Sequence, residues 1–128
     1  MNRRLPLLAL GAALTAAVLA PVACSSSTAS PQVITGGDRS AGVDAILHYG
    51  CGSCHTIPGV KGANALVGPP LTHWSRRSFV AGKLPNTPPN LEHWVQDPQS
   101  VWPGNDMPNL GVTPTDARNI AAYLDGLG

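Results

Sequence analysis

The stretch Cys51-Gly52-Ser53-Cys54-His55 holds two of the three cysteines and one of the four histidines in this chain of 128 residues. Two thiols and an imidazole within five residues form a compact set of soft and nitrogen ligands. What they hold depends on the compartment in which the chain works and on the sequence around them.

Residues 1–23 have the features of an export signal. Arg3 and Arg4 form a positive start, residues 5–19 form an apolar run, and small residues precede Cys24. The apolar run is shorter than the roughly 20 residues that a membrane-spanning helix needs. We therefore expect an exported protein that works in the periplasm or on the outer face of the cytoplasmic membrane.

Cys24 lies where a lipoprotein signal peptidase would cut, and the region resembles a bacterial lipoprotein, although Pro21 stands where that motif has leucine. A diacylated Cys24 would anchor the protein to the membrane surface without spanning it. The alternative is a soluble secreted form that is cut nearby. Residues 24–37 are small and polar and predict a flexible tether, and residues 38–128 predict one small domain.

The charge of the processed chain is close to zero. Six of the eight Lys and Arg residues remain after Arg3 and Arg4 are removed, against all seven Asp and Glu residues. No basic run survives, so we expect no nucleic-acid partner. A domain of this size with one Phe, two Tyr and three Trp has a small core, and a large apolar cofactor would complete it.

Three helices are predicted from apolar residues at helical spacing. The first covers about 40–49 and is capped by Asp38 or Ser40, the second runs from Thr87 to Asp97, and the third starts at Thr113 with a capping-box-like pattern. The apolar stripes are Val43, Ile46, Leu47 and Gly50; Leu91, Trp94 and Val95; and Ile120, Tyr123, Leu124 and Leu127. The sequence between the first two helices predicts long loops with a short helical turn around 76–81 and no strand pattern. The expected class is all-α.

The chemistry of the cysteine motif can be narrowed by its surroundings. A zinc site needs four protein ligands, or three and a water, and no second Cys or His pair completes such a set. A thioredoxin-type motif belongs in a βαβ context, which is not predicted here, and a structural disulfide leaves His55 unexplained. The pattern C-x-x-C-H is the attachment signature of c-type haem, in which both thiols bind the porphyrin and the histidine binds the iron. We therefore predict one covalently attached haem c.

The residues alone offer one main candidate for the sixth ligand of the iron. Met1 leaves with the signal, and Met107 lies in a loop between Pro103 and Pro108. A thioether in a stiff loop is suited to binding the iron as an axial ligand, but it is equally suited to packing against the core. At this point both interpretations stay open.

The segments CGSCHTIPGV, GPPL, RRSFVAG, LPNTPPNLEHWVQDPQSVWPGNDMPNLGV and DARNIAAYL resemble, in this order, the class I cytochrome c family. More narrowly, they resemble the cytochrome c domains associated with, or fused to, subunit II of bacterial haem–copper oxidases. The resemblance spans nearly all of residues 38–128 and implies a small cytochrome c fold. It implies thioether bonds at Cys51 and Cys54, axial ligation by His55 and Met107, and a Pro69 carbonyl that accepts the His55 Nδ1–H.

The resemblance also assigns residues around the haem. Gly42 and Tyr123 would meet where the first and last helices cross, with Ile46 replacing the family's usual aromatic residue on the first helix. Arg76 and Arg77 match paired arginines that would donate to the haem propionates. The alternative is that one or both are solvated surface charges.

Other aromatic residues and histidines receive simpler interpretations. Trp74 and Trp94 are candidates for the pocket wall, although Trp94 also fits plain core packing, and Trp102 is a candidate contact for a partner. His48 is expected at the surface. His73 and His93 are expected at the surface or the pocket edge, where each is an alternative sixth ligand.

These features predict a carrier of single electrons rather than an enzyme. Ligation by Met and His leaves no vacant position on the iron and raises its potential. The expected partners are respiratory membrane complexes, with a cytochrome bc complex or a dehydrogenase as donor and a terminal oxidase as acceptor. Two alternatives remain: a haem enzyme or gas sensor with an open sixth position, and a non-haem disulfide or metal protein.

Overall fold

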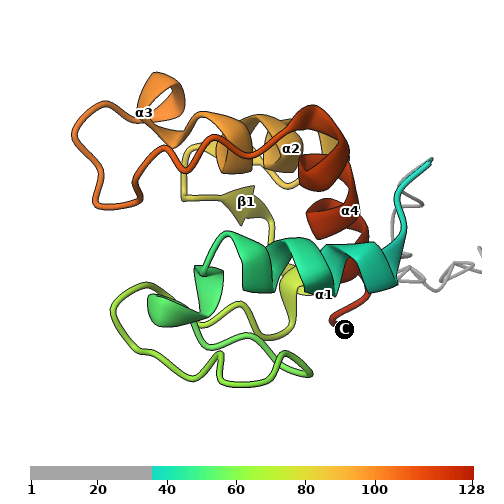
Figure 1. The fold of residues 1–128 in the computed structure, drawn as a ribbon. Helices are drawn as coiled ribbons and strands as arrows, with labels where there is room; N and C mark the ends of the chain where they lie inside the picture. The colour runs from blue at the N-terminus through green and yellow to red at the C-terminus, as the bar shows by residue number, and fades with distance from the viewer. Residues whose placement is uncertain (1–35) are drawn as a thin grey trace, which may run out of the picture.

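The computed structural model describes residues 36–128, so the predicted signal, Cys24 and most of the predicted tether lie outside the described residues. The described chain is mainly helical, as expected, with four α-helices and one small hairpin (Figure 1). The elements in order are α1 (Arg39–His48), the 3-10 turn η1 (Cys51–Ser53), the 3-10 turn η2 (Trp74–Arg76), β1 (Phe79–Val80), β2 (Leu84–Pro85), α2 (Pro88–Gln96), α3 (Pro98–Val101) and α4 (Pro114–Asp125).

The first and last helices pack directly against each other (Figure 1). Their contact is close because α1 presents Gly42 to α4. A Cβ at Gly42 would lie 2.3 Å from the Asn119 carbonyl oxygen and 2.9 Å from Tyr123 Cβ. The predicted meeting of Gly42 and Tyr123 is therefore present, and a larger residue at Gly42 would force the helices apart.

Two helix starts follow the predicted capping chemistry. Asp38, rather than Ser40, caps α1, because its carboxylate accepts from the backbone N–H groups of Ser40 and Ala41 at 2.7 and 3.0 Å. Thr113 caps α4, and its Oγ1 accepts from the Asp116 N–H at 3.2 Å. These bonds satisfy donors that the first turn of a helix leaves without intrahelical partners.

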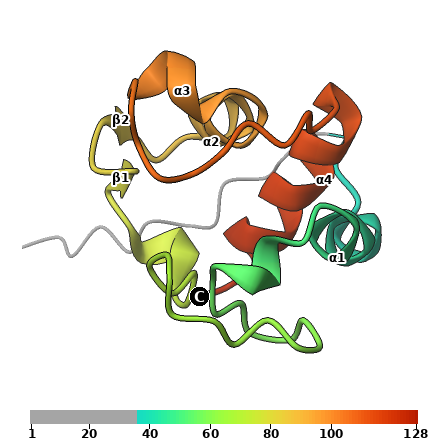
Figure 2. The same cartoon turned by 60° about the vertical axis from the view of Figure 1, so that its left-hand side comes forward.

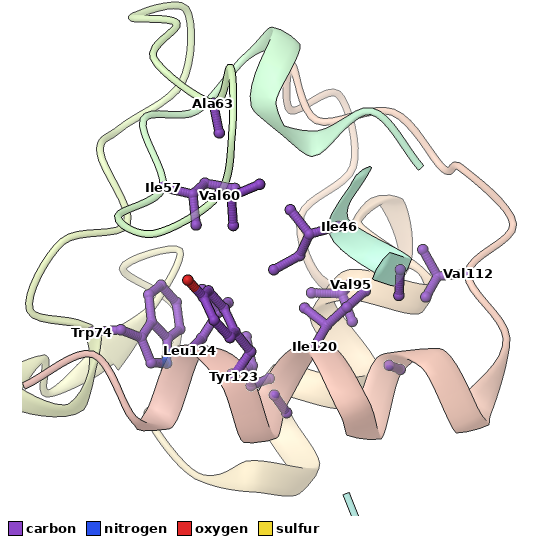
Figure 3. Packing of buried hydrophobic residues seen from close by; sticks show 14 of the residues in the cluster. Ile46, Ile57, Val60, Ala63, Trp74, Val95, Val112, Ile120, Tyr123 and Leu124 are labelled. Carbon is purple, nitrogen blue, oxygen red and sulfur yellow. The ribbon is translucent and has the colours of Figure 1, made fainter. Parts of the chain in front are cut away.

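The hydrophobic core lies between α1, α2, α4 and the loop after η1. Figure 3 shows Ile46 of α1 gathered with residues of the other helices and of the 51–73 loop. The buried cluster consists of Ala45, Ile46, Ile57, Val60, Ala63, Trp74, Val80, Leu91, Val95, Val112, Ala117, Ile120, Ala121, Tyr123 and Leu124. This core joins the N-terminal helix α1 to the C-terminal helix α4 and also packs against the loop after η1.

Two expectations about the first half of the domain were wrong. Leu47 is 50% exposed, because α1 turns the face of Gly42, Ala45 and Ile46 toward α4. The helical turn expected at 76–81 lies earlier, at Trp74–Arg76, and Phe79–Val80 instead forms a strand paired antiparallel with Leu84–Pro85. The hairpin is tight because Ala81 and Gly82 both take positive φ, at 50° and 67°.

The third correction concerns the region after α2. Asp97 ends α2 as predicted, but the chain then forms α3, which the sequence analysis did not predict. The Asp97 carboxylate caps this short helix by accepting from the Ser100 N–H at 3.2 Å. In the described part of the chain, no helix has the length and apolar character needed to cross a membrane.

Candidate cofactor site

A cavity of about 490 Å³ lies at the centre of the fold. In Figure 2, α1 and α4 lie on one side of the centre, α2 and α3 above it, the hairpin opposite and the 51–73 loop below. The cavity brings together Cys51, Cys54, His55 and Met107. The wall between them is largely apolar and includes Ile46, Leu71, Leu91, Val95, Ile120 and Leu124. The size lies within the range of small-molecule and cofactor sites.

The cysteine motif reaches this cavity through a tight turn. The chain turns after α1 at Gly50, which takes φ 68°. The η1 turn follows, and the N–H groups of Cys54 and His55 donate to the Cys51 carbonyl at 3.2 and 3.0 Å. Both thiols are free and half-buried. Burial raises the pKa of the Cys51 thiol above its ordinary value.

The imidazole of His55 is fixed by two neighbours in the following loop. The His55 Nδ1 lies 2.8 Å from the Pro69 carbonyl oxygen, which can only accept, so Nδ1 carries the proton. This leaves Nε2 free to bind a metal. Gly68 packs against the ring, because a Cβ there would lie 2.5 Å from His55 Cε1 and 2.7 Å from Nδ1. Gly68 opens the GPPL segment, but the sequence alone gives no signal for its contact with His55.

Met107 lies far from the cysteine motif in the sequence, in the loop between α3 and α4, and lines the same cavity. Its backbone N–H donates to Asn105 Oδ1 at 2.8 Å, and its carbonyl accepts from Gln99 Nε2 at 2.9 Å. Two side chains therefore hold the backbone of a residue that has no regular secondary structure. Gln99 and Asn105 were missed because α3 was not predicted, and the sequence carries no local signal for their contacts.

The two adjacent arginines have different surroundings. Arg77 is half-buried and lines the cavity, and its guanidinium carbon lies 5.0 Å from the centroid of the Trp74 ring. It also donates to the carbonyls of Pro70 and Thr72. Arg76 is exposed and does not line the cavity. Arg77 is therefore the arginine that can reach a ligand in this site.

The three tryptophans all line the cavity. Trp74 is buried, Trp94 is half-buried, and Trp102 is 44% exposed with Lys83 Nζ lying 4.4 Å from its ring centroid. Trp94 thus contributes to the cavity wall and not to the core alone. The prediction that Trp102 contacts a partner stays a prediction.

His48, His73 and His93 are exposed, and none of them lines the cavity. His73 Nδ1 lies 3.1 Å from the Gly128 carbonyl oxygen, and His93 Nε2 lies 2.9 Å from Ser100 Oγ. The structure does not bring either of the alternative sixth ligands to the site. Among residues 36–128, no three His, Cys, Asp or Glu side chains come together as a metal-binding group.

The residues at the cavity fit a c-type haem. Two thiols and an oriented imidazole face the same apolar space as a thioether, and a half-buried guanidinium lies beside it. Thiols suit attachment to the porphyrin, nitrogen and sulfur suit the iron, and the guanidinium suits a carboxylate. Gly68 leaves space for the imidazole that any larger residue would fill.

Comparisons with known proteins agree with this chemistry. A family model described as Cytochrome c matches residues 41–128. The cytochrome c oxidase subunit 2 of Alkalihalophilus pseudofirmus is 38% identical over 78 residues, which are 60% of this chain and 22% of that protein. The protein of the same name from Bacillus subtilis is 37% identical over 83 residues, or 60% of this chain and 23% of that protein. The chain therefore spans less than a quarter of the length of these relatives.

Proposed function

The chain belongs to the cytochrome c family, and from that premise we propose that it is a monohaem c-type cytochrome that carries single electrons between respiratory membrane complexes. The observation that carries this proposal is the convergence of Cys51, Cys54, His55 and Met107 on one apolar cavity. Bound in such a site, haem supplies an iron centre that changes oxidation state by one electron, at a potential that methionine ligation raises.

Each residue of the site has a proposed role. Cys51 and Cys54 would form the thioether bonds, and His55 would bind the iron through Nε2 while the Pro69 carbonyl holds its ring. Met107 would supply the second protein ligand of the iron. Arg77 rather than Arg76 neutralises a haem propionate, because only Arg77 lines the cavity. With two iron ligands supplied by the chain, no position on the iron would remain for a substrate, so the protein would act as a carrier and not as an enzyme.

The proposed partners follow from the relatives. Because the matched proteins are named cytochrome c oxidase subunit 2, we propose a terminal oxidase as electron acceptor. A cytochrome bc complex or a dehydrogenase is the proposed donor. The predicted signal and a lipid anchor at Cys24, both outside the described residues, would place the domain on the outer face of the cytoplasmic membrane. Such an anchor would raise its effective concentration beside these complexes.

Haem attachment is tested by haem staining of the exported protein after denaturing electrophoresis. The wild type is expected to stain, because thioether bonds survive denaturation, and the Cys51→Ala/Cys54→Ala variant is expected to lose the stain. Ser53→Ala, between the two cysteines, is the matched control and should stain like the wild type. A colourless wild-type band would overturn the proposal in favour of a non-haem disulfide or metal protein.

Electron transfer is tested with the reduced holoprotein and membranes that contain the terminal oxidase. We expect oxidation of the cytochrome to be rapid and cyanide-sensitive. Carbon monoxide provides the second arm, because an iron with two protein ligands resists its binding. Rapid uptake of carbon monoxide by the wild type, without loss of a ligand, would favour a haem enzyme or gas sensor instead.

A further inference from the structure

The loop that carries Met107 is held by side chains rather than by regular secondary structure. Residues 102–113 lie outside any helix or strand, and Gly104 takes φ 79° where the chain turns back. A ligand on such a segment keeps a fixed position only if its backbone is fixed. The contacts that fix the backbone of Met107 therefore bear on the chemistry of the site.

Gln99 of α3 makes three hydrogen bonds to this loop. Its Oε1 accepts from the Gly104 N–H at 3.0 Å, and its Nε2 donates to the Asn105 carbonyl at 3.0 Å and the Met107 carbonyl at 2.9 Å. The partners fix the orientation of the amide, because an N–H needs an acceptor and carbonyls need donors. A carboxamide offers one acceptor oxygen and two N–H donors at one place.

We infer that Gln99 is a positioning residue for Met107, a role that rests on the proposed function above because it assumes that Met107 binds the iron. Gln99 holds the carbonyl of Met107 while Asn105 holds its N–H. Asn105 is in turn anchored by its Nδ2 to the carbonyls of Pro98 and Trp102 at 3.0 and 2.6 Å. The backbone of Met107 is thus held by two amide side chains, one on α3 and one in the loop itself, and loosening them would favour release of the ligand.

A change of Gln99 to Glu separates hydrogen bonding from shape. The introduced carboxylate has the size of the amide and still accepts from the Gly104 N–H, but it presents negative oxygens to two carbonyls. It therefore keeps the bond from the Gly104 N–H and loses the two donated bonds, one of them to the Met107 carbonyl. Gln99→Leu loses all three.

The test uses exported holoprotein with haem attached and added imidazole as a competing ligand for the ferric iron. We expect Gln99→Glu to bind imidazole about tenfold more tightly than the wild type at pH 8, as for the loss of roughly one to two hydrogen bonds. Gln99→Leu, which offers neither a donor nor an acceptor, should bind imidazole at least as tightly as Gln99→Glu.

The matched control is Gln96→Glu. Gln96 is also half-buried and donates from Nε2 to a carbonyl, that of Glu92 at 2.9 Å, but this bond lies within α2 and does not reach the loop that carries Met107. This control should bind imidazole like the wild type at pH 8. Hydrogen exchange of the Gly104 amide gives an independent readout, which should be faster in Gln99→Leu than in Gln99→Glu.

The result separates the failure of this inference from failure of the proposed function. Met107→Ala, measured in parallel, should raise imidazole affinity more than either Gln99 variant. If Met107→Ala has no effect, the ligand assignment itself is wrong. If Met107→Ala has the expected effect but either Gln99 variant binds imidazole like the wild type, the inference about Gln99 is overturned alone.

Discussion

The two sides of the cavity are built by different means. His55 is positioned by local backbone: the η1 turn, the close approach of Gly68 and the Pro69 carbonyl all lie within fifteen residues of it. Met107 lies on a loop without regular structure and is positioned by the side chains of Gln99 and Asn105. The difference predicts a rigid histidine side that tolerates no added volume and a methionine side that depends on side-chain hydrogen bonds.

The largest effect is expected from breaking the rigid side. Gly68→Ala adds a methyl group 2.5 Å from His55 Cε1, so the imidazole must move. Overpacking of this kind costs about 1–3 kcal/mol, and here the strain falls on the proposed iron ligand. We expect a reduced haem content and a changed absorption spectrum in the purified protein.

Gly62→Ala is the control for this change. Gly62 lies in the same loop with φ 78°, and a Cβ there meets nothing within 4 Å. The substitution costs about 1–2 kcal/mol in backbone strain, but it brings no atom into contact with the imidazole. The account of the rigid side would be wrong if Gly68→Ala kept the haem content and spectrum of the wild type.

An intermediate effect is expected at the arginine pair. Arg77→Ala removes a positive charge from the cavity wall, whereas Arg76→Ala removes one from the exposed surface. Loss of a nearby positive charge favours the oxidised iron, by an amount on the order of 1 kcal/mol. Potentiometric titration should show a lower midpoint potential for Arg77→Ala and little change for Arg76→Ala. Equal shifts in the two variants would show that the cavity wall does not distinguish them.

The smallest effect is expected at the link between α1 and α4, the two helices that support both sides of the cavity. Asp116 Oδ2 accepts from Thr113 Oγ1 and from Tyr49 Oη, each at 2.8 Å, which ties the end of α1 to the start of α4. These bonds, that of Thr113 first and that of Tyr49 second, lower the pKa of Asp116. Because the folded protein favours the carboxylate, this stabilisation is present above the unfolded pKa and is lost as the pH falls through the lowered folded pKa.

Thermal unfolding of Asp116→Asn checks this point. The variant should melt below the wild type at pH 7, and the gap should close as the pH falls below about 4. Asp44→Asn, at an exposed position of α1, should melt with the wild type throughout. A gap for Asp116→Asn that persists at low pH would mean that the bonds do not depend on the carboxylate.

The same contrast explains what the sequence could predict. The cysteine motif, the Thr113 cap and the α1–α4 crossing depend on local patterns or on a family resemblance, and the structure has the cap and the crossing as expected. Gly68 and Gln99 carry no local signature, because their roles arise from contacts with His55 and Met107 that only the folded chain creates. Asp97-Pro98 indicated only a helix end, since the pattern does not show that Asp97 also caps α3.

The central claim is that the iron is held between an imidazole and a thioether supplied by opposite sides of the cavity. X-ray absorption at the iron edge of the purified holoprotein tests it most directly, with Met107→Ala as the comparison. The account predicts one sulfur neighbour of the iron in the wild type and none in the variant, with the nitrogen shell containing His55 retained in both. A wild-type iron without a sulfur neighbour, or a sulfur signal that survives in Met107→Ala, would contradict it.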